Sequence, residues 1–412
     1  MANVPRPSQV RGASSRRRCS TKAVVASDAV TPRGAALLIF VVAACTNTPA
    51  PAATPRASPV VPSTPSSGAL KDPGALHFSA QTVVGGLEAP WALDFAKDGA
   101  IWLTERPGRV RVVRAGRLLP DPALTLNAVT AAGCEDGLLG LTVREPYVYL
   151  YYTYRGSSGN TNRLSRFSIQ GDKLASEQVL LDGIPGGTCY HFGGRIRFGP
   201  DGLLYVTTGE GFVPSRATDP NNLSGKILRM REDGSNREVF AWGFRNPQGI
   251  AFDNTGRLYA SNNGPTSDLG LCCHDEIDLV QQGGFYGWPE WAANVRTTYP
   301  QGGLPAQRVA PLAESGDAVW APSGMSFYSP AKDERATLIV AELRGQVLRR
   351  FVFDASDPAK VTGQEVAFQG AGRMRDAVAG PDLCLYALTS NKDSRGSPQA
   401  GDDKLLKLCP AG

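Results

Sequence analysis

One unit recurs along this chain, and it restricts the possible folds more than any other feature. It consists of an apolar strand, a turn built on Asp-Gly or a similar pair, and a second strand rich in Tyr, Trp, Val and Leu. Markers of successive copies, such as Trp102, Tyr149 and Tyr205, are about 50 residues apart, with one longer insertion near residues 285–325. The six copies fall at residues 93–104, 147–154, 196–208, 250–261, 325–343 and 377–389.

A single such unit has unpaired strand edges and an exposed apolar face. Radial stacking of several units buries the faces and shortens the edges. The sequence therefore predicts an all-β fold, a six-bladed β-propeller with four-stranded antiparallel blades, over residues 75–412. A pair of packed sandwiches is the alternative, but it explains the spacing less well. No stretch has the long amphipathic helices that an α/β fold requires.

The N-terminal residues 1–45 have the pattern of an export signal. An apolar run at 35–44 follows a flank that contains Arg16 and Arg33, and it is too short to span a bilayer. Small residues precede Cys45, an arrangement that resembles a bacterial lipoprotein signal, so Cys45 is the predicted lipidation site. An ordinary signal peptide with an incidental cysteine is the alternative. We expect an exported protein, anchored by lipid on the outer face of the cell membrane or periplasmic.

Residues 46–74 are dominated by Pro, Ala, Thr and Ser, and such a segment buries too little surface to fold. They are predicted to form a disordered tether, which would be the protein's link to the membrane. The net charge of +5 is small, and part of it lies in the Arg-rich first 33 residues. This balance argues against a nucleic-acid partner.

Six cysteines lie within the predicted domain, and export favours disulfide bonds between them. Two of them lie in apolar runs near the C-terminus that look like paired strands, and two are adjacent in sequence. Zinc is the competing interpretation, but no Cys-x-x-Cys spacing supports it. The predicted pairs are Cys384 with Cys409, Cys272 with Cys273, and Cys134 with Cys189.

The clearest reactive candidate is His191, one of three histidines, which begins the segment His-Phe-Gly-Gly-Arg ahead of a predicted hairpin. A neutral imidazole can take a proton from a hydroxyl group, although a lone histidine is more often structural. Three further motifs follow in order: Trp242-Gly-Phe-Arg-Asn-Pro-Gln-Gly249, Asn263-Gly-Pro265 and Gly284-Phe-Tyr-Gly-Trp-Pro289. The ordered set resembles the soluble quinoprotein aldose dehydrogenases, also called glucose/sorbosone dehydrogenases, across residues 85–409.

This resemblance implies the cofactors pyrroloquinoline quinone (PQQ) and Ca²⁺, an aldose substrate and an external electron acceptor. It implies that His191 is the general base while hydride leaves the anomeric carbon, which gives a lactone. Arginine forks suit the three carboxylates of PQQ. Arg375 is also expected to stabilise the reduced oxygen, and for any single arginine a solvated surface charge is the alternative. The positions that match cofactor contacts are Arg245, Asn246, Gln248, Arg344, Arg373 and Arg375.

The resemblance also implies a metal site, because Ca²⁺ prefers hard oxygen ligands, including backbone carbonyls. The carbonyls of Gly264 and Pro265 match the family's metal ligands, and Asp275 with Glu276 matches an acidic pair. Asp268 is a nearer acidic alternative. Gly-Pro by itself is simply a turn signal.

The chain departs from the family on the side where the sugar would be held. Glucose-active members carry Asp before the histidine and Gln before Gly-Leu-Leu-Gly, where this chain has Tyr190 and Glu135. Both are candidate substrate contacts, and Glu135 could instead be the partner of an arginine. Two rival functions remain: a non-catalytic propeller that binds a ligand or protein, and a Ca²⁺-dependent lactonase. A lactonase requires a cluster of Asn, Asp and Glu ligands, which is not evident here beyond Asn262-Asn263.

Overall fold

A computed structural model describes residues 70–131, 133–305 and 307–411. The predicted leader at 1–45, the lipidation site Cys45 and residues 46–69 of the predicted tether lie outside the described residues. The end of that tether contacts the domain, since the Lys71 N–H donates to the Asp333 carbonyl over 2.7 Å. No helix within the described ranges has the length and apolar character needed to cross a membrane.

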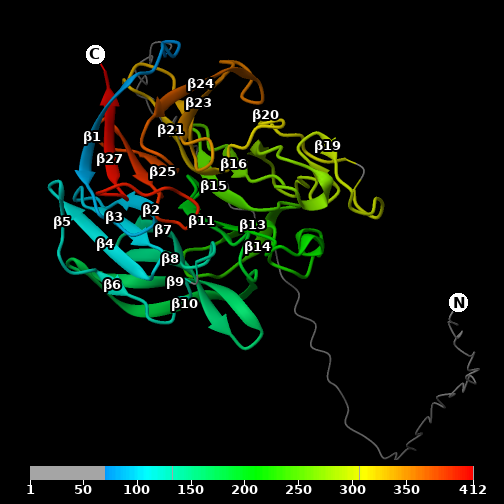
Figure 1. Ribbon diagram of the computed structural model, residues 1–412, viewed down its shortest axis with the longest axis horizontal. Helices are drawn as coiled ribbons and strands as arrows, with labels where there is room; N and C mark the ends of the chain where they lie inside the picture. Colours follow the sequence, from blue (N-terminus) through cyan, green and yellow to red (C-terminus); the bar gives the residue numbers. More distant parts are fainter. Residues whose placement is uncertain (1–69, 132, 306, 412) are drawn as a thin grey trace, which may run out of the picture. The chain divides into compact units, whose positions relative to one another are not determined.

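The described chain is all-β, and the predicted six-bladed propeller is confirmed (Figure 1). Antiparallel neighbours follow one another in each sheet, because each turn returns the chain beside the strand it has just left. The first three blades are β2 (Pro90–Phe95), β3 (Ile101–Glu105), β4 (Arg109–Arg114) with the short β5 (Arg117–Leu118) and β6 (Leu124–Thr125); β7 (Leu138–Arg144), β8 (Tyr147–Gly156), β9 (Gly159–Gln170) and β10 (Lys173–Pro185); and β11 (Gly193–Phe198), β12 (Leu204–Thr208), β13 (Lys226–Met230) and β14 (Glu238–Trp242).

The remaining blades repeat the plan, and each predicted repeat falls on the two inner strands of one blade. The predicted insertion carries a separate two-stranded hairpin. These blades are β15 (Pro247–Phe252), β16 (Leu258–Asn262), β17 (Glu276–Val280) and β20 (Ala313–Glu314); β21 (Pro322–Tyr328), β22 (Thr337–Glu342), β23 (Val347–Phe353) and β24 (Val361–Gln369); and β25 (Met374–Ala379), β26 (Leu385–Thr389), β27 (Leu405–Pro410) and β1 (Phe78–Val84). The other elements are the hairpin β18 (Trp291–Ala292) and β19 (Val295–Arg296), and the 3-10 turns η1 (Pro214–Ala217) and η2 (Asp268–Gly270).

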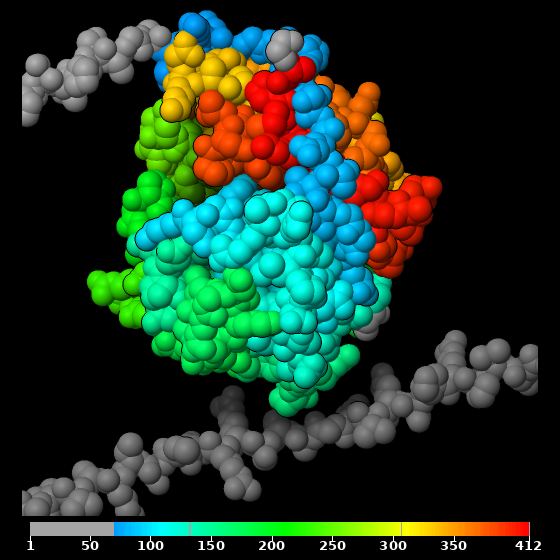
Figure 2. Space-filling model, turned by 90° about the vertical axis from the view of Figure 1, so that its left-hand side faces the viewer, coloured from blue at the N-terminus to red at the C-terminus, as the bar shows by residue number. Residues whose placement is uncertain are grey.

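The inner strands form a closed ring around a central channel. Strand β2 contacts β7, and the contacts continue through β11, β15, β21 and β25 back to β2. The ring is closed by pairing the two ends of the domain, since β1 is antiparallel to β27 with Ser79 opposite Cys409. The blue β1 lies beside the red β27 in both views (Figures 1 and 2). This pairing gives the last blade its fourth strand.

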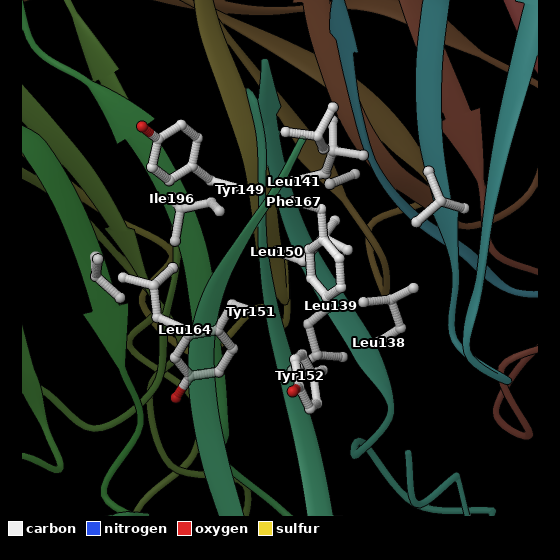
Figure 3. Packing of buried hydrophobic residues seen from close by; sticks show 14 of the residues in the cluster. Leu138, Leu139, Leu141, Tyr149, Leu150, Tyr151, Tyr152, Leu164, Phe167 and Ile196 are labelled. Carbon is white, nitrogen blue, oxygen red and sulfur yellow. The ribbon is translucent and has the colours of Figure 1, made fainter. Parts of the chain in front are cut away.

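Apolar side chains fill the space between neighbouring blades. Leu139, Tyr151 and Ile196, from β7, β8 and β11, are buried in one such cluster (Figure 3). The glycine pair beside His191 has its explanation here. A Cβ on Gly194 would lie 3.1 Å from both Leu139 and Tyr151, and one on Gly193 would lie 2.5 Å from the Gly209 nitrogen. These glycines let β11 pack closely against its neighbours.

The three predicted disulfide pairs are all present: Cys134–Cys189, Cys272–Cys273 and Cys384–Cys409. The last of them joins the start of β26 to β27, as predicted for a stapled C-terminal hairpin.

Candidate active site

A cavity of about 620 Å³ lies at one end of the channel, where loops from several blades converge. The cavity brings together most of the predicted site residues, although they are far apart in the sequence. Pro265 and Glu276 are the predicted residues that do not line it. Those that do are Glu135, Tyr190, His191, Arg245, Asn246, Gln248, Gly264, Asp268, Asp275, Arg344, Arg373 and Arg375.

His191 stands at the cavity wall, buried and with both its ring and its backbone fixed. Its Nδ1 lies 2.6 Å from Glu210 Oε1, and its backbone N–H donates to Glu135 Oε2 over 2.9 Å. Glu210 ends strand β12 and is fully buried. Because an ionised carboxylate accepts hydrogen bonds, Glu210 favours the tautomer that carries the proton on Nδ1. The Nε2 lone pair is then free to accept a proton.

A group of arginines gives the cavity its electrostatic character. Six arginines line it, against four carboxylates. Arg373 and Arg375, at the start of β25, both donate to Asp393 Oδ2, over 2.8 Å and 3.2 Å. Burial lowers the pKa of Arg375 to about 9, although the charge of Asp393 opposes this. The buried Nε of Arg375 has no partner within the described residues. The surplus of positive charge suits an anionic ligand.

Two more of the predicted cations occupy the same wall. Arg245 forms a two-pronged ion pair with Asp268, with both N–O distances 2.9 Å. Arg344 is exposed at the cavity, and its guanidinium makes no ion pair within the described ranges. The amides beside Arg245 are already engaged in part. Asn246 Oδ1 accepts from the Gly193 N–H over 3.0 Å, and Gln248 Oε1 accepts from Arg375 over 3.0 Å.

The floor of the cavity is a buried ion pair that crosses the channel. Arg195 on β11 donates to Asp376 Oδ2 on β25 over 2.8 Å, and these strands stand opposite each other in the ring. The Arg195 guanidinium also lies 4.2 Å from the ring centroid of Trp91, which lines the cavity. Burial lowers the pKa of Arg195 to about 10. These side chains fill the channel beneath the site.

The predicted metal region has two parts that differ in orientation. Asp275 accepts backbone N–H groups from Gly264, Trp320 and Ala321 over 2.8–2.9 Å, so it fixes the Gly264 peptide at the cavity wall. Burial raises its pKa to about 6. Glu276 is oriented differently, and its Oε2 accepts from Asn262 over 2.7 Å. No group of three or more His, Cys, Asp or Glu side chains suited to a metal occurs in the described part of the chain.

The two predicted substrate contacts lie together on the opposite wall, where the Cys134–Cys189 disulfide joins their loops. Glu135 forms an ion pair with Arg395 over 3.2 Å, in keeping with the alternative interpretation of this residue. Burial alone would raise the pKa of Glu135, but the neighbouring His191 and Arg395 hold it below its ordinary value. The Arg395 guanidinium also lies 5.0 Å from the ring centroid of Tyr190.

Sequence reasoning missed the residues that orient the predicted ones. Glu210, Asp393 and Arg395 received no role, although each contacts a predicted site residue. Glu210 was detectable in principle, because it is an acidic residue between two glycines at the end of a predicted inner strand. Asp393 follows strand β26 in a polar loop, and no local pattern distinguishes it from a surface aspartate.

Fold and site together define a propeller enzyme class: a channel-top cavity with one oriented histidine and an arginine-rich wall. The model of the family Glucose / Sorbosone dehydrogenase matches residues 87–397. The chain belongs to the glucose/sorbosone dehydrogenase family and is an oxidoreductase of the sugar dehydrogenase type.

Individual relatives agree with this assignment. The aldose sugar dehydrogenase YliI of Escherichia coli is 28% identical over 355 residues, which cover 79% of this chain and 91% of that protein. A structure from Thermus thermophilus, titled as a putative glucose dehydrogenase, is 40% identical, with a TM-score of 0.71 over 80% of this chain and 99% of that one. The PQQ-bound aldose sugar dehydrogenase of Streptomyces coelicolor is 30% identical, with a TM-score of 0.69 over 81% and 98% of the two chains.

Proposed function

We propose that this protein oxidises the anomeric carbon of an aldose to a lactone, with PQQ as the resident cofactor. The observation that carries the proposal is the pairing of His191 with Glu210 at the wall of an arginine-rich cavity. In the reaction, Nε2 of His191 takes the proton of the anomeric hydroxyl, and the hydrogen on that carbon leaves as hydride. The C–O bond thereby becomes a carbonyl, and two electrons leave the sugar.

The chain's own residues fit an anionic quinone. PQQ carries three carboxylates, and Arg245, Arg344, Arg373 and Arg375 are positioned to hold them, with Asn246 and Gln248 alongside. The unpartnered Nε of Arg375 and the unpaired guanidinium of Arg344, within the described part of the chain, are donors that such a ligand would satisfy. When bound, the quinone would supply the two-electron acceptor for the hydride. A PQQ-bound relative supports this assignment.

We further propose Ca²⁺ beside the quinone, held by the carbonyl oxygens of Gly264 and Pro265. Carbonyl oxygens are ligands that Ca²⁺ accepts, and Asp275 fixes the Gly264 peptide through a 2.9 Å hydrogen bond. The role assigned to Asp275 is therefore to orient this peptide, while Glu276 contacts neither the cavity nor Gly264. The ion would polarise a carbonyl of the quinone.

Export is the third part of the proposal. Three disulfides within the domain support it, because such bonds persist in oxidising compartments and are rare in the cytosol. Together with the signal pattern at 1–45 they favour a lipid anchor at Cys45, and the electrons would then pass to an acceptor outside the membrane. Metabolic labelling with a fatty acid tests this directly. Label on the wild-type protein but not on Cys45→Ser is the expected result.

The decisive experiment adds PQQ and Ca²⁺ to the purified apo-protein and follows dye reduction across a panel of aldoses. Turnover that requires PQQ and is increased by Ca²⁺ is expected. His191→Ala should lower kcat by about a hundredfold or more while PQQ binding, followed by absorbance, is unchanged. His77→Ala is the matched control, because His77 lies outside the cavity. An unchanged kcat in His191→Ala would remove the assigned base, and absence of PQQ binding would favour a non-catalytic binding propeller.

A further inference from the structure

An apolar patch lies beside the catalytic histidine at the mouth of the cavity. It consists of Tyr190, Phe212 and Val213, whose exposed fractions are 38%, 53% and 39%. Tyr190 and Phe212 also line the cavity itself. Exposed large apolar side chains that gather at a cavity mouth mark a contact surface, since single ones scattered over a surface need no explanation.

The backbone of Phe212 is held in an unfavourable conformation. Its φ is +60°, in the left-handed region that a bulky side chain seldom adopts and that costs on the order of 1 kcal/mol or more. The ring is half exposed, so burial in the core does not compensate for that cost. Strain of this kind persists where the surroundings impose it, and it is concentrated at functional sites.

The surroundings of Phe212 do impose its position. The Gly211 N–H donates to the His191 carbonyl over 3.0 Å, and the Val213 N–H donates to Glu210 Oε2. The carboxylate that orients the His191 ring therefore also fixes the turn that carries Phe212.

The loop beyond Phe212 is folded around an internal cation. Lys226 Nζ donates to the carbonyls of Arg216, Ala217 and Ser224 over 2.8–2.9 Å. Both ends of this loop are therefore anchored, one at Glu210 and the other at Lys226. The Phe212 ring cannot withdraw from the mouth without breaking these contacts.

The ring of Phe212 lies next to the reacting position. Its centroid is 5.3 Å from that of His191 and 5.8 Å from that of Tyr190, and both pairs are edge-on. A sugar whose anomeric hydroxyl reaches Nε2 of His191 has the rest of its ring within van der Waals reach of this patch.

We propose that Phe212 is a specificity-determining residue that packs against the apolar C–H face of the sugar ring while His191 receives the anomeric hydroxyl. This inference rests on the proposed sugar dehydrogenase function. Aromatic faces attract the weakly positive hydrogens of C–H groups, and Tyr190 extends the same apolar surface. A pyranose presents such a face, whereas polar groups around its edge would meet Glu135 and Arg395.

The first test compares Phe212→Ala, Phe212→Leu and Phe212→Tyr in the PQQ-loaded enzyme. Loss of an aromatic contact should raise the KM for pyranoses about tenfold in Phe212→Ala and leave kcat within about twofold. Phe212→Tyr should behave as the wild type, and Phe212→Leu should be intermediate. Equal KM values in all four proteins would overturn the proposal.

Leu383→Ala is the matched control. Leu383 is 39% exposed and also has a positive φ of 62°, but it lies outside the cavity. Its substitution should leave KM unchanged. A comparable increase in KM for Leu383→Ala would show that the Phe212 effect is a general response to losing an exposed side chain, and would also overturn the proposal.

A second readout separates this inference from the proposed function. Methyl β-D-glucopyranoside cannot be oxidised at its blocked anomeric oxygen, so saturation-transfer NMR detects its binding without turnover. We expect saturation of its C–H protons in the wild type and its loss in Phe212→Ala. Binding of this kind without oxidation of any aldose would support the sugar platform and reject the dehydrogenase. Wild-type turnover without any difference in NMR or KM would do the reverse. Slower reoxidation by the acceptor, with unchanged KM for the sugar, would overturn the sugar contact and reassign the patch to acceptor docking.

Discussion

At the scale of single residues, the site depends on carboxylates that hold other side chains in place. Glu210 orients His191, Asp393 bridges Arg373 and Arg375, and Asp268 grips Arg245. Each of these acids is separated in sequence from its partner by between 18 and 23 residues. They lie beside the reactive groups and set their charge, tautomer and direction.

Glu210→Gln is predicted to lower kcat by about tenfold or more. An amide can donate to Nδ1 of His191, which would move the ring proton to Nε2 and remove the acceptor needed for the sugar hydroxyl. The measurement is the pH profile of kcat in the PQQ-loaded enzyme, together with PQQ affinity. The amide oxygen can still accept from Val213, so the fold and PQQ binding should be retained. A profile identical to that of the wild type would contradict the assigned role of Glu210.

Asp393→Asn is predicted to lower the free energy of unfolding by about 3–5 kcal/mol at pH 7, because two buried arginines lose their shared partner. Burial alone would raise the pKa of Asp393, but Arg375 and Arg373 hold it below its ordinary 3.8. A lowered folded-state pKa stabilises the protein above the unfolded value, and this contribution is lost as the pH falls through the folded value. The difference between wild type and variant in urea denaturation should therefore shrink below about pH 4. A difference independent of pH would indicate lost packing instead.

At the scale of elements, the site is built on loops that covalent and polar links make rigid. The Cys134–Cys189 disulfide joins two loops 55 residues apart, and these loops carry Glu135 and Tyr190 beside His191. The Cys384–Cys409 disulfide joins two paired strands in the last blade, away from the cavity. The two bridges therefore separate a role at the site from a role in stability.

Cys134→Ser with Cys189→Ser is predicted to lower stability by about 2–4 kcal/mol and also to raise the KM for the sugar. Freed loops would no longer hold Glu135 against the His191 backbone. The pair Cys384→Ser with Cys409→Ser is the control, with a similar loss of stability and an unchanged KM. Thermal unfolding and steady-state kinetics measure the two effects. A KM that rises equally in both double variants would make the first bridge purely structural.

Much of this architecture was predictable at the level of elements. The strand-turn-strand repeat placed the two inner strands of every blade, because alternating strands and Asp-Gly turns are local features. The arginines and His191 were placed by ordered motifs. Glu210, Asp393 and Phe212 were not, since their roles depend on contacts across turns and between blades. The orientation of Glu276 away from the cavity was equally inaccessible, because neighbouring residues on a strand point to opposite faces.

At the scale of the whole molecule, the propeller is a closed ring whose centre is filled. Pairing of β1 with β27 joins the two ends of the domain, so removal of either strand would open the ring. Across the centre, Arg195 and Asp376 tie opposite blades together beneath the cavity. A separate hollow lined by Asp94, Thr142 and Arg197 lies toward the other ends of β2, β7 and β11, and it shares no residue with the cavity. The channel therefore does not connect the two.

That filled channel determines the order of events in the proposed reaction. Because Arg195, Asp376 and Trp91 block the rear, sugar and electron acceptor reach the same small space through one mouth. The lactone must depart before the acceptor can approach, which predicts ping-pong kinetics. Initial rates at several fixed acceptor concentrations should give parallel double-reciprocal lines, with each reactant inhibiting competitively against the other when in excess. Intersecting lines would show that both reactants are bound at once and that a second route to the site exists.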